Sequence, residues 1–94
     1  MINGDTKDFI EGLNIGKEMA IIFRGERFLI QGWWENGHAR ITVDSLDKPH
    51  DNKYLWSFCA DSMSQCADAF LEARLWDNKV FGDAEEEMRW TDNW

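Results

Sequence analysis

The stretch Trp34-Glu35-Asn36-Gly37-His38-Ala39 decides the fold of this chain. Asn-Gly is the preferred pair for a two-residue type I′ hairpin turn, because both turn positions need a positive φ. The turn also sets the register of the two strands that it joins. It produces three cross-strand pairs on one face of the hairpin: Trp34–Ala39, Gly32–Ile41 and Ile30–Val43. We expect this mainly apolar face to lie against the core.

The other face of the hairpin holds the pairs Trp33–Arg40, Gln31–Thr42 and Leu29–Asp44. A turn at Arg24-Gly25-Glu26 joins a first strand, about Glu18–Phe23, to the same sheet. The parity of that strand adds three residues to the core face: Met19, Ile21 and Phe23. It puts Ala20 and Ile22 beside Leu29 and Trp33. This second face is therefore partly apolar. Either the N-terminal helix covers it, which is the alternative we favour, or it is a contact surface.

Two segments have helical spacing. Asp5 or Thr6 can cap a short N-terminal helix with Phe9, Ile10 and Leu13 on one side. The main helix is expected over about Ser62–Leu75, where Ser62 and Gln65 form a capping box and Asp61 is an alternative cap. Its apolar stripe follows the helical period: Met63, Cys66, Ala67, Phe70, Leu71 and Leu75.

The remaining segments complete the expected order of elements. Lys53–Phe58 alternates, with Tyr54, Trp56 and Phe58 on one side, and is expected as a fourth strand. Asp77-Asn78-Lys79 is expected as a turn. Asp83 can then cap a short last helix. Glu85–Glu87 would occupy its first turn, where the helix dipole favours carboxylates.

These segments predict one α+β domain over residues 1–94. It combines an antiparallel meander of three to four strands, one main C-terminal helix on one face, and short N- and C-terminal helices. Hydrophobic residues make up 44% of the chain and aromatic residues 14%. That composition is too apolar for a disordered acidic protein, so we expect a folded core.

The net charge of −8 is concentrated in the second part of the chain. Residues Cys59–Trp94 hold nine acids and three bases, whereas Met1–Phe58 holds nine acids and seven bases. Phosphates would repel this charge, which argues against direct binding of nucleic acid or of an anionic membrane. Met1–Ile15 is polar and no apolar run could span a bilayer, so we expect a cytoplasmic protein.

Several chemistries are not expected. Zinc needs four clustered ligands, but His38, His50, Cys59 and Cys66 are scattered over different segments. No glycine-rich loop precedes a helix, so no phosphate cradle is expected. Cys66 lies on the apolar stripe and is expected to be a buried thiol. Two cysteines do not form a disulfide framework. We therefore expect no catalytic residue, no metal and no cofactor, and interpret the chain as a non-enzyme.

Two surfaces remain as candidates for binding a partner. The first is the acidic, tryptophan-bearing C-terminal region: Asp83, Glu85, Glu86, Glu87, Trp90, Asp92 and Trp94. Aromatic anchors rimmed by charge have the composition of interface hot spots. For Trp90 we favour burial against the sheet over exposure. The second is the sheet face around Leu29 and Trp33. Trp33 beside Arg40 is the one basic–aromatic cluster, and a cross-strand cation–π pair is its favoured interpretation.

The segment Phe70-Leu71-Glu72-Ala73-Arg74-Leu75-Trp76-Asp77-Asn78-Lys79-Val80-Phe81, followed by Glu85-Glu86-Glu87-Met88-Arg89-Trp90, resembles the closing segment of small acidic proteins of Firmicutes and their phages. The resemblance covers about a quarter of the chain. Some such phage proteins are similar in size and charge to anti-CRISPR and other anti-defence inhibitors. The resemblance implies an inhibitor that occludes a nucleic-acid-binding surface, and it assigns no individual residue.

The leading hypothesis is thus a non-enzymatic inhibitor that blocks a basic, nucleic-acid-handling host protein through its acidic half. Carboxylates would occupy sites meant for phosphates, and Trp90, Trp94 or Trp33 would anchor the contact. The alternative is a self-associating or partner-binding module that uses the apolar sheet face around Leu29 and Trp33, without nucleic-acid mimicry. A homodimer is left open.

Overall fold

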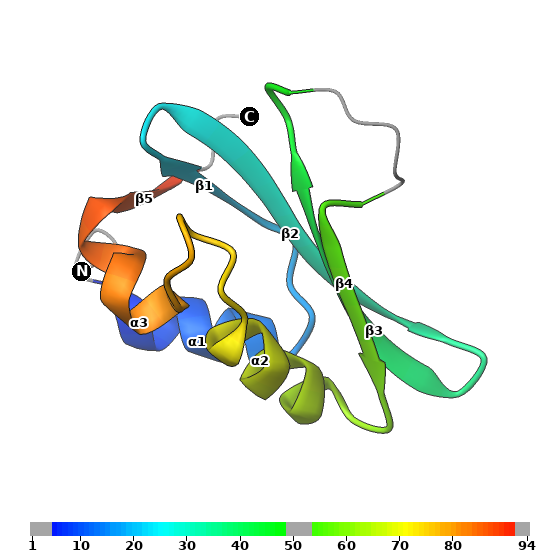
Figure 1. Ribbon diagram of the computed structural model, residues 1–94. Coiled ribbons are helices and arrows are strands. Elements are labelled where there is room, and N and C mark those ends of the chain that lie inside the picture. Colours follow the sequence, from blue (N-terminus) through cyan, green and yellow to red (C-terminus); the bar gives the residue numbers. More distant parts are fainter. Residues whose placement is uncertain (1–4, 49–53, 92–94) are drawn as a thin grey trace.

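A computed structural model describes residues 5–48 and 54–91 and shows an α+β fold (Figure 1). One antiparallel sheet is covered on one face by helices. The elements in chain order are α1 (Thr6–Asn14), β1 (Met19–Phe23), β2 (Glu26–Glu35), β3 (His38–Ser45), β4 (Trp56–Ala60), α2 (Met63–Glu72), α3 (Phe81–Ala84), the 3₁₀ turn η1 (Glu85–Glu87) and β5 (Met88–Thr91).

The hairpin β2–β3 has the predicted register. Trp34 pairs with Ala39, Gly32 with Ile41 and Ile30 with Val43. The turn residues Asn36 and Gly37 have φ values of 53° and 81°, as a type I′ turn requires. Arg24 and Gly25 repeat this geometry between β1 and β2, with φ values of 51° and 81°. The two turns give β1, β2 and β3 a common parity, so the predicted core face is confirmed in these strands.

The sheet has five strands in the order β4-β3-β2-β1-β5, rather than the three to four that we expected. The additional strand is β5, which pairs Trp90 with Ile21 and Met88 with Phe23. We had placed these residues in and after a last acidic helix. That prediction was wrong: Asp83 lies inside α3, whose N-cap is Val80, and Glu85–Glu87 form the separate turn η1. A strand follows η1, because the alternating Met88 and Trp90 can bury their side chains by pairing along the otherwise open edge of β1.

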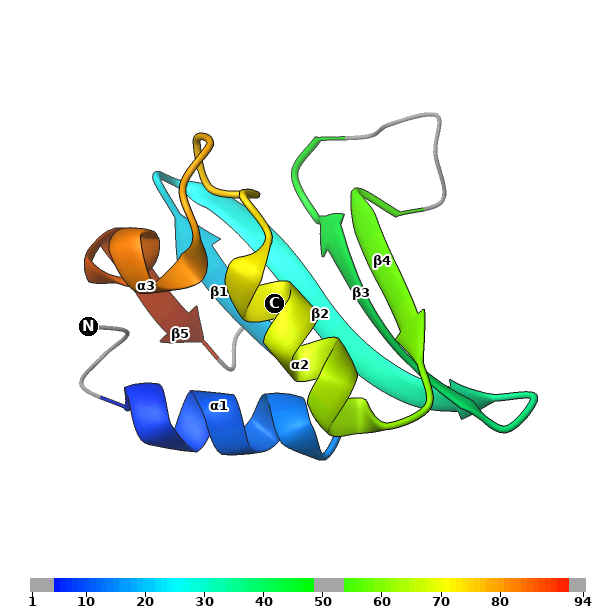
Figure 2. The ribbon, with the colours of Figure 1, turned by 60° about the horizontal axis from the view of Figure 1, so that its bottom comes forward.

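Helix α1 does not cover the second sheet face, so the favoured alternative was wrong. It lies beside α2 on the core face (Figure 2). Phe9 of α1 is fully buried and stacks on Phe81, with ring centroids 5.1 Å apart. The link from α1 to β1 comprises only residues 15–18, and Gly16 within it has a φ of 71°. This short link returns the chain to the side where β1 presents Met19 and Ile21.

Helix α2 begins as predicted and ends earlier. The Ser62–Gln65 capping box is present, since the Gln65 backbone N–H donates to Ser62 Oγ at 3.2 Å. Met63, Cys66, Ala67 and Phe70 are buried, as expected from the apolar stripe. The helix ends at Glu72 rather than Leu75, because Ala73 adopts an extended backbone with ψ of 137°.

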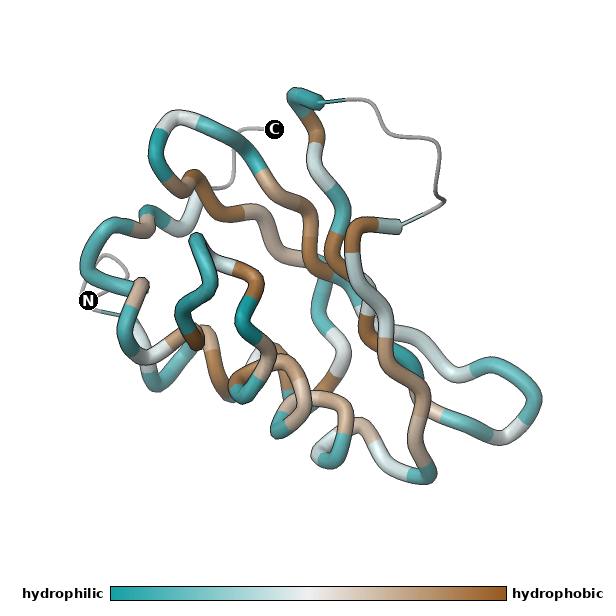
Figure 3. Tube along the Cα trace, in the orientation of Figure 1, coloured by the Kyte–Doolittle hydropathy of each residue, from teal (hydrophilic) through white to brown (hydrophobic). Residues whose placement is uncertain are grey.

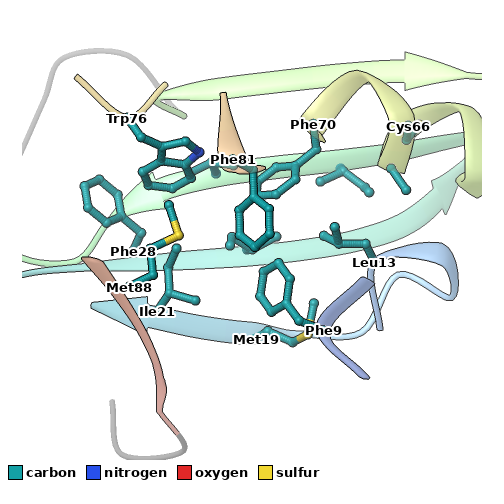
Figure 4. Close-up of a cluster of buried hydrophobic side chains, with 14 of the residues drawn as sticks. Phe9, Leu13, Met19, Ile21, Phe28, Cys66, Phe70, Trp76, Phe81 and Met88 are labelled. Atoms are coloured by element: carbon teal, nitrogen blue, oxygen red, sulfur yellow. The ribbon is translucent and has the colours of Figure 1, made fainter. Parts of the chain in front are cut away.

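The largest fully buried side chains of the core are aromatic (Figure 4). Trp76, which follows α2, is 1% exposed and packs edge-on against Phe28 at 5.2 Å and Phe23 at 5.6 Å between ring centroids. The chain reverses after Trp76 at Asp77 and Asn78, which have positive φ values of 55° and 62°. This is the predicted turn. The turn allows Trp76, a loop residue, to fill the space between the sheet and α2.

The fourth strand starts three residues later than predicted and ends two residues later. It begins at Trp56 rather than Lys53, and Lys53 itself lies outside the described residues. Tyr54 precedes the strand and contacts Trp33 on the second face, at 6.1 Å between ring centroids. It therefore does not share a side with Trp56 and Phe58. Trp34 has core-face parity but is 60% exposed, so its parity did not predict its burial.

A prediction follows from the close approach of two glycines. A Cβ on Gly32 would lie 2.7 Å from the Gly16 Cα and 3.2 Å from the Arg40 carbonyl oxygen, both of which are backbone atoms. We expect Gly32→Ala to lower the free energy of unfolding by about 1–3 kcal/mol, because the backbone must shift. Urea denaturation measures this change.

Gly82→Ala is the matched control, since a Cβ on Gly82 in α3 would meet nothing within 4 Å. We expect the control to leave stability unchanged or to raise it by up to about 1 kcal/mol. Equal losses in the two variants would contradict the proposed close approach.

Candidate partner-binding surfaces

The structure separates the predicted site residues instead of gathering them. Asp83 in α3 and Glu86 in η1 are exposed, and neither side chain makes a hydrogen bond or ion pair within the described part of the chain. Glu85 and Glu87 are each tied to another segment. Asp92 and Trp94 lie outside the described residues. Consequently, part of the acidic C-terminal region connects segments of the fold, and part of it is exposed to solvent.

Glu87 belongs to a three-membered ion cluster around Arg24. The Arg24 Nε and Nη2 atoms donate to the two Glu87 carboxylate oxygens at 2.9 and 3.0 Å, and Nη1 donates to Asp77 Oδ2 at 2.8 Å. These hydrogen bonds hold the pKa of both carboxyl groups below its ordinary range. The cluster joins the β1–β2 turn to the loop after α2 and to η1. Glu85 makes a separate joint, because the Thr6 hydroxyl donates to its carboxylate at 3.0 Å.

Trp90 is partly buried, in agreement with the interpretation that we favoured. It sits on β5 opposite Ile21, and its ring meets Phe9 edge-on at 5.6 Å. The ammonium group of Lys17 lies 5.4 Å from its ring centroid. The indole therefore attaches β5 to α1 and to the core. A partner that used Trp90 as an anchor would have to displace some of these contacts.

Trp33 lies on the opposite side of the sheet from the helices. It lines a pocket of about 210 Å³ together with Glu35, Arg40 and Tyr54. Arg40 donates to Glu35 at 3.1 Å and to Ser57 at 3.4 Å, whereas Trp33 contacts Tyr54. Trp33 and Arg40 are cross-strand partners, as we expected, and they line the same pocket. Among the described residues, the expected cation–π contact between them is not found. Trp33 cannot join one contact surface with Asp83 and Glu86.

The net charge is instead distributed unequally between the helical layer of the fold and the rest of the described chain. We define the acidic layer as residues 5–14 and 61–87, which contain α1, α2, α3, η1 and the links between the last three. It carries eleven acids and three bases, a net charge of −8, whereas the other described residues carry five acids and six bases, a net of +1. The acids of the layer are Asp5, Asp8, Glu11, Asp61, Asp68, Glu72, Asp77, Asp83, Glu85, Glu86 and Glu87.

Helices α1 and α2 contribute to this surface, which we did not predict from the sequence. Asp8 and Glu11 are exposed on α1, and Asp68 and Glu72 are exposed on α2. These acids lie far from the C-terminus in sequence, but the two helices lie side by side in the fold (Figure 2). Counting charge separately over helical and strand segments would have revealed the division.

Cys66 and His38 are two of the titratable side chains, other than the carboxylates, that were considered in the sequence as ligands or nucleophiles. Cys66 is fully buried on α2, its thiol donates to the Ala39 carbonyl at 3.3 Å, and burial raises its pKa. His38 Nδ1 lies 3.3 Å from Asp61 Oδ1 at the surface. Within residues 5–48 and 54–91, no three or more His, Cys, Asp or Glu side chains cluster in a way that could hold a metal ion. No helix in this part is long and apolar enough to cross a bilayer.

In comparisons with known proteins, no protein-family model, no curated protein and no solved structure matches the chain. Any functional assignment therefore depends on the residues and their arrangement.

The ion pairs predict how stability depends on pH. Asp77 and Glu87, held by Arg24, and Asp47, held by Arg27, have a folded-state pKa below the ordinary values of 3.8 for Asp and 4.5 for Glu. A lowered folded-state pKa stabilises the fold above the ordinary pKa, and this contribution is lost as the pH falls through the folded-state value. We expect the free energy of unfolding to decrease steadily below about pH 4.5. Denaturation titrations at a series of pH values measure it.

Arg24→Asn tests the share of the Arg24 cluster, because Asn tolerates the positive φ of this position. The variant should show a smaller loss of stability on acidification than the parent protein. Arg24→Lys keeps the charge and should fall between the two. An identical acid dependence in all three proteins would rule out this role for the cluster.

Proposed function

We propose that the chain is a small acidic protein-binding module that acts as a non-enzymatic inhibitor. Its acidic layer would occupy a basic, nucleic-acid-binding surface of a host protein. The observation that carries the proposal is the charge division, since a net charge of −8 lies on the acidic layer and a net of +1 on the rest of the described chain. An anti-defence role, phage or mobile-element origin and action in the cytoplasm would fit this mode of action.

The placement of the acids supports a role beyond solubility. Asp68 and Glu72 are four residues apart on α2, and Asp8 and Glu11 are three apart on α1. Like charges at these spacings destabilise a helix by about 0.2–0.5 kcal/mol per pair. A solubilising charge could be spread over both layers without this cost. Concentration of the acids on one layer creates a negative electrostatic potential on that side of the molecule, which attracts a cationic surface.

The exposure of the acids supports the same mode of binding. All eleven acids of the acidic layer except Glu85 are exposed. Asp8, Glu11, Asp68, Glu72, Asp83 and Glu86 have no ion-pair partner within the described segments. Carboxylates without an internal partner can pair with Lys and Arg side chains that otherwise bind phosphates. Such contacts mainly raise the association rate and are sensitive to salt.

The test is competition for a partner captured by the immobilised protein. We expect a short double-stranded DNA to displace the captured protein, because DNA and the acidic layer would use the same basic surface. Binding should also weaken steeply as the ionic strength rises from about 0.05 to 0.5 M, since the Debye length falls to a few ångströms. A partner that resists both DNA and salt would refute the proposal.

Charge-reversal variants locate the contact. Glu72→Lys and Glu86→Lys each change the net charge by the same amount as Glu18→Lys, which lies outside the acidic layer just before β1. We expect the two variants in the layer to weaken binding about fivefold, for roughly 1 kcal/mol, and the control to change it much less. Equal effects of all three would mean that net charge alone governs association.

The uncovered sheet face favours a second candidate, a binding module without nucleic-acid mimicry. Leu29 and Trp33 are half-buried there, and the helices lie on the other side (Figure 2). If this face is the contact, Trp33→Ala should weaken partner binding by about 2 kcal/mol, as the loss of an aromatic anchor does. Trp34→Ala is the control, because Trp34 belongs to the same strand but has core-face parity. Both affinities can be measured by calorimetry at high salt.

A further inference from the structure

The strand β4 has an unusually open environment for a strand of this sheet. It forms one edge, and none of the described strands pairs with its outer side. Three consecutive residues, Ser57, Phe58 and Cys59, are exposed. Its inner side pairs with β3 from Ala39↔Ala60 to Val43↔Trp56. The outer side therefore presents a row of backbone N–H and C=O groups that can accept another strand.

The side chains of β4 do not protect this edge. Residues 54–60 read Tyr-Leu-Trp-Ser-Phe-Cys-Ala and include no charged residue and no proline. Figure 3 shows no strongly hydrophilic residue along β4. Natural edge strands are commonly protected by lysines, prolines or bulges that oppose pairing with another chain. The opposite edge strand, β5, has Arg89 within it and follows Glu85–Glu87 directly.

The edge also extends the hydrophobic core outward. Phe58 is 41% exposed and stacks on Trp56, with ring centroids 6.2 Å apart and planes 9° from parallel. Trp56 in turn meets the fully buried Phe70 of α2 edge-on at 6.2 Å. A row of aromatic rings thus runs from the core to the solvent at β4. A second apolar surface at this edge would bury Phe58 and lengthen that row.

We propose that a second copy of this chain pairs with β4 in antiparallel orientation and joins the two five-stranded sheets into one. An interface with twofold symmetry uses the same strand of both copies, so this strand must be able to pair with itself. The uncharged segment 54–60 meets that requirement, because no like charges would face each other. The Phe58 and Trp56 rings of the two copies would pack together on the helix side of the joined sheet.

The charge of the molecule determines how salt affects such a dimer. Each copy carries a net charge of −8, so two copies repel each other at low ionic strength. Added salt screens this repulsion and leaves the apolar contact and the backbone hydrogen bonds in place. Dimer formation should therefore strengthen with salt. The proposed binding of a basic partner should weaken with salt, so the two proposals can fail independently.

Sedimentation equilibrium over a range of protein and salt concentrations tests the dimer. We expect the mass to rise from 11.0 kDa towards twice that value as either concentration increases. Phe58→Lys should restore the monomer. Trp34→Lys is the matched control, because it places the same charge at an exposed aromatic position, 60% exposed, that is not on the edge strand. Circular dichroism verifies that both variants are folded, and Ser57→Lys replaces Phe58→Lys if the latter fails to fold.

The position of the contact is tested with a nitroxide on Cys59, which is exposed, whereas Cys66 is buried and shielded from labelling. For any antiparallel pairing with its twofold axis within β4, the two Cys59 backbones lie within about 20 Å, because a strand rises about 3.3 Å per residue. Pulsed dipolar spectroscopy should give one short distance that disappears in Phe58→Lys. A monomer under all conditions would overturn the proposal. So would a dimer that is lost in Leu29→Asp and retained in Phe58→Lys, because the contact would then be the sheet face.

Discussion

Burial of the aromatic core against a single face of the sheet is the constraint on which the rest of this structure depends. The two type I′ turns give β1, β2 and β3 a common parity, so that Met19, Ile21, Ile30, Ile41 and Val43 point the same way. All three helices have to cover this side to remove it from water. No helix covers the second face of the sheet. The short strands β4 and β5 form its two edges.

One-sided coverage also explains where the charge lies. A helix that packs on a sheet buries one stripe and exposes the rest of its surface, so the acids of α1 and α2 must point outward. The strands face the core on one side and are nearly neutral in total on the described residues. The fold therefore converts a net charge of −8 into a molecule with one acidic layer. The proposed inhibitor function rests on this asymmetry rather than on any reactive group.

Arg24 shows how a turn residue can serve the tertiary structure. Its positive φ belongs to the β1–β2 turn, and its guanidinium group holds Asp77 and Glu87 from two later segments. The Asp77 turn positions Trp76 over Phe23 and Phe28, and Glu87 precedes β5. The same cluster thus helps to hold Trp76 in the core and to position the residues that lead into β5. It also gives the exposed Glu87 carboxylate a partner within the fold.

Local sequence was sufficient for the α+β class, the hairpin register, the capping box of α2 and the burial of Cys66 and Phe70. Each depends on backbone preferences or on spacing within about a dozen residues, for example the positive φ at Asn36-Gly37. The fifth strand, the side taken by α1 and the separation of Trp33 from Glu86 were decided only by packing. Met88–Thr91 is a strand because the edge of β1 accepts it, and α1 joins the core because the short link through Gly16 brings Phe9 to Phe81. Those contacts join residues up to about seventy positions apart, and no local pattern in the chain encodes which of them lowers the free energy most.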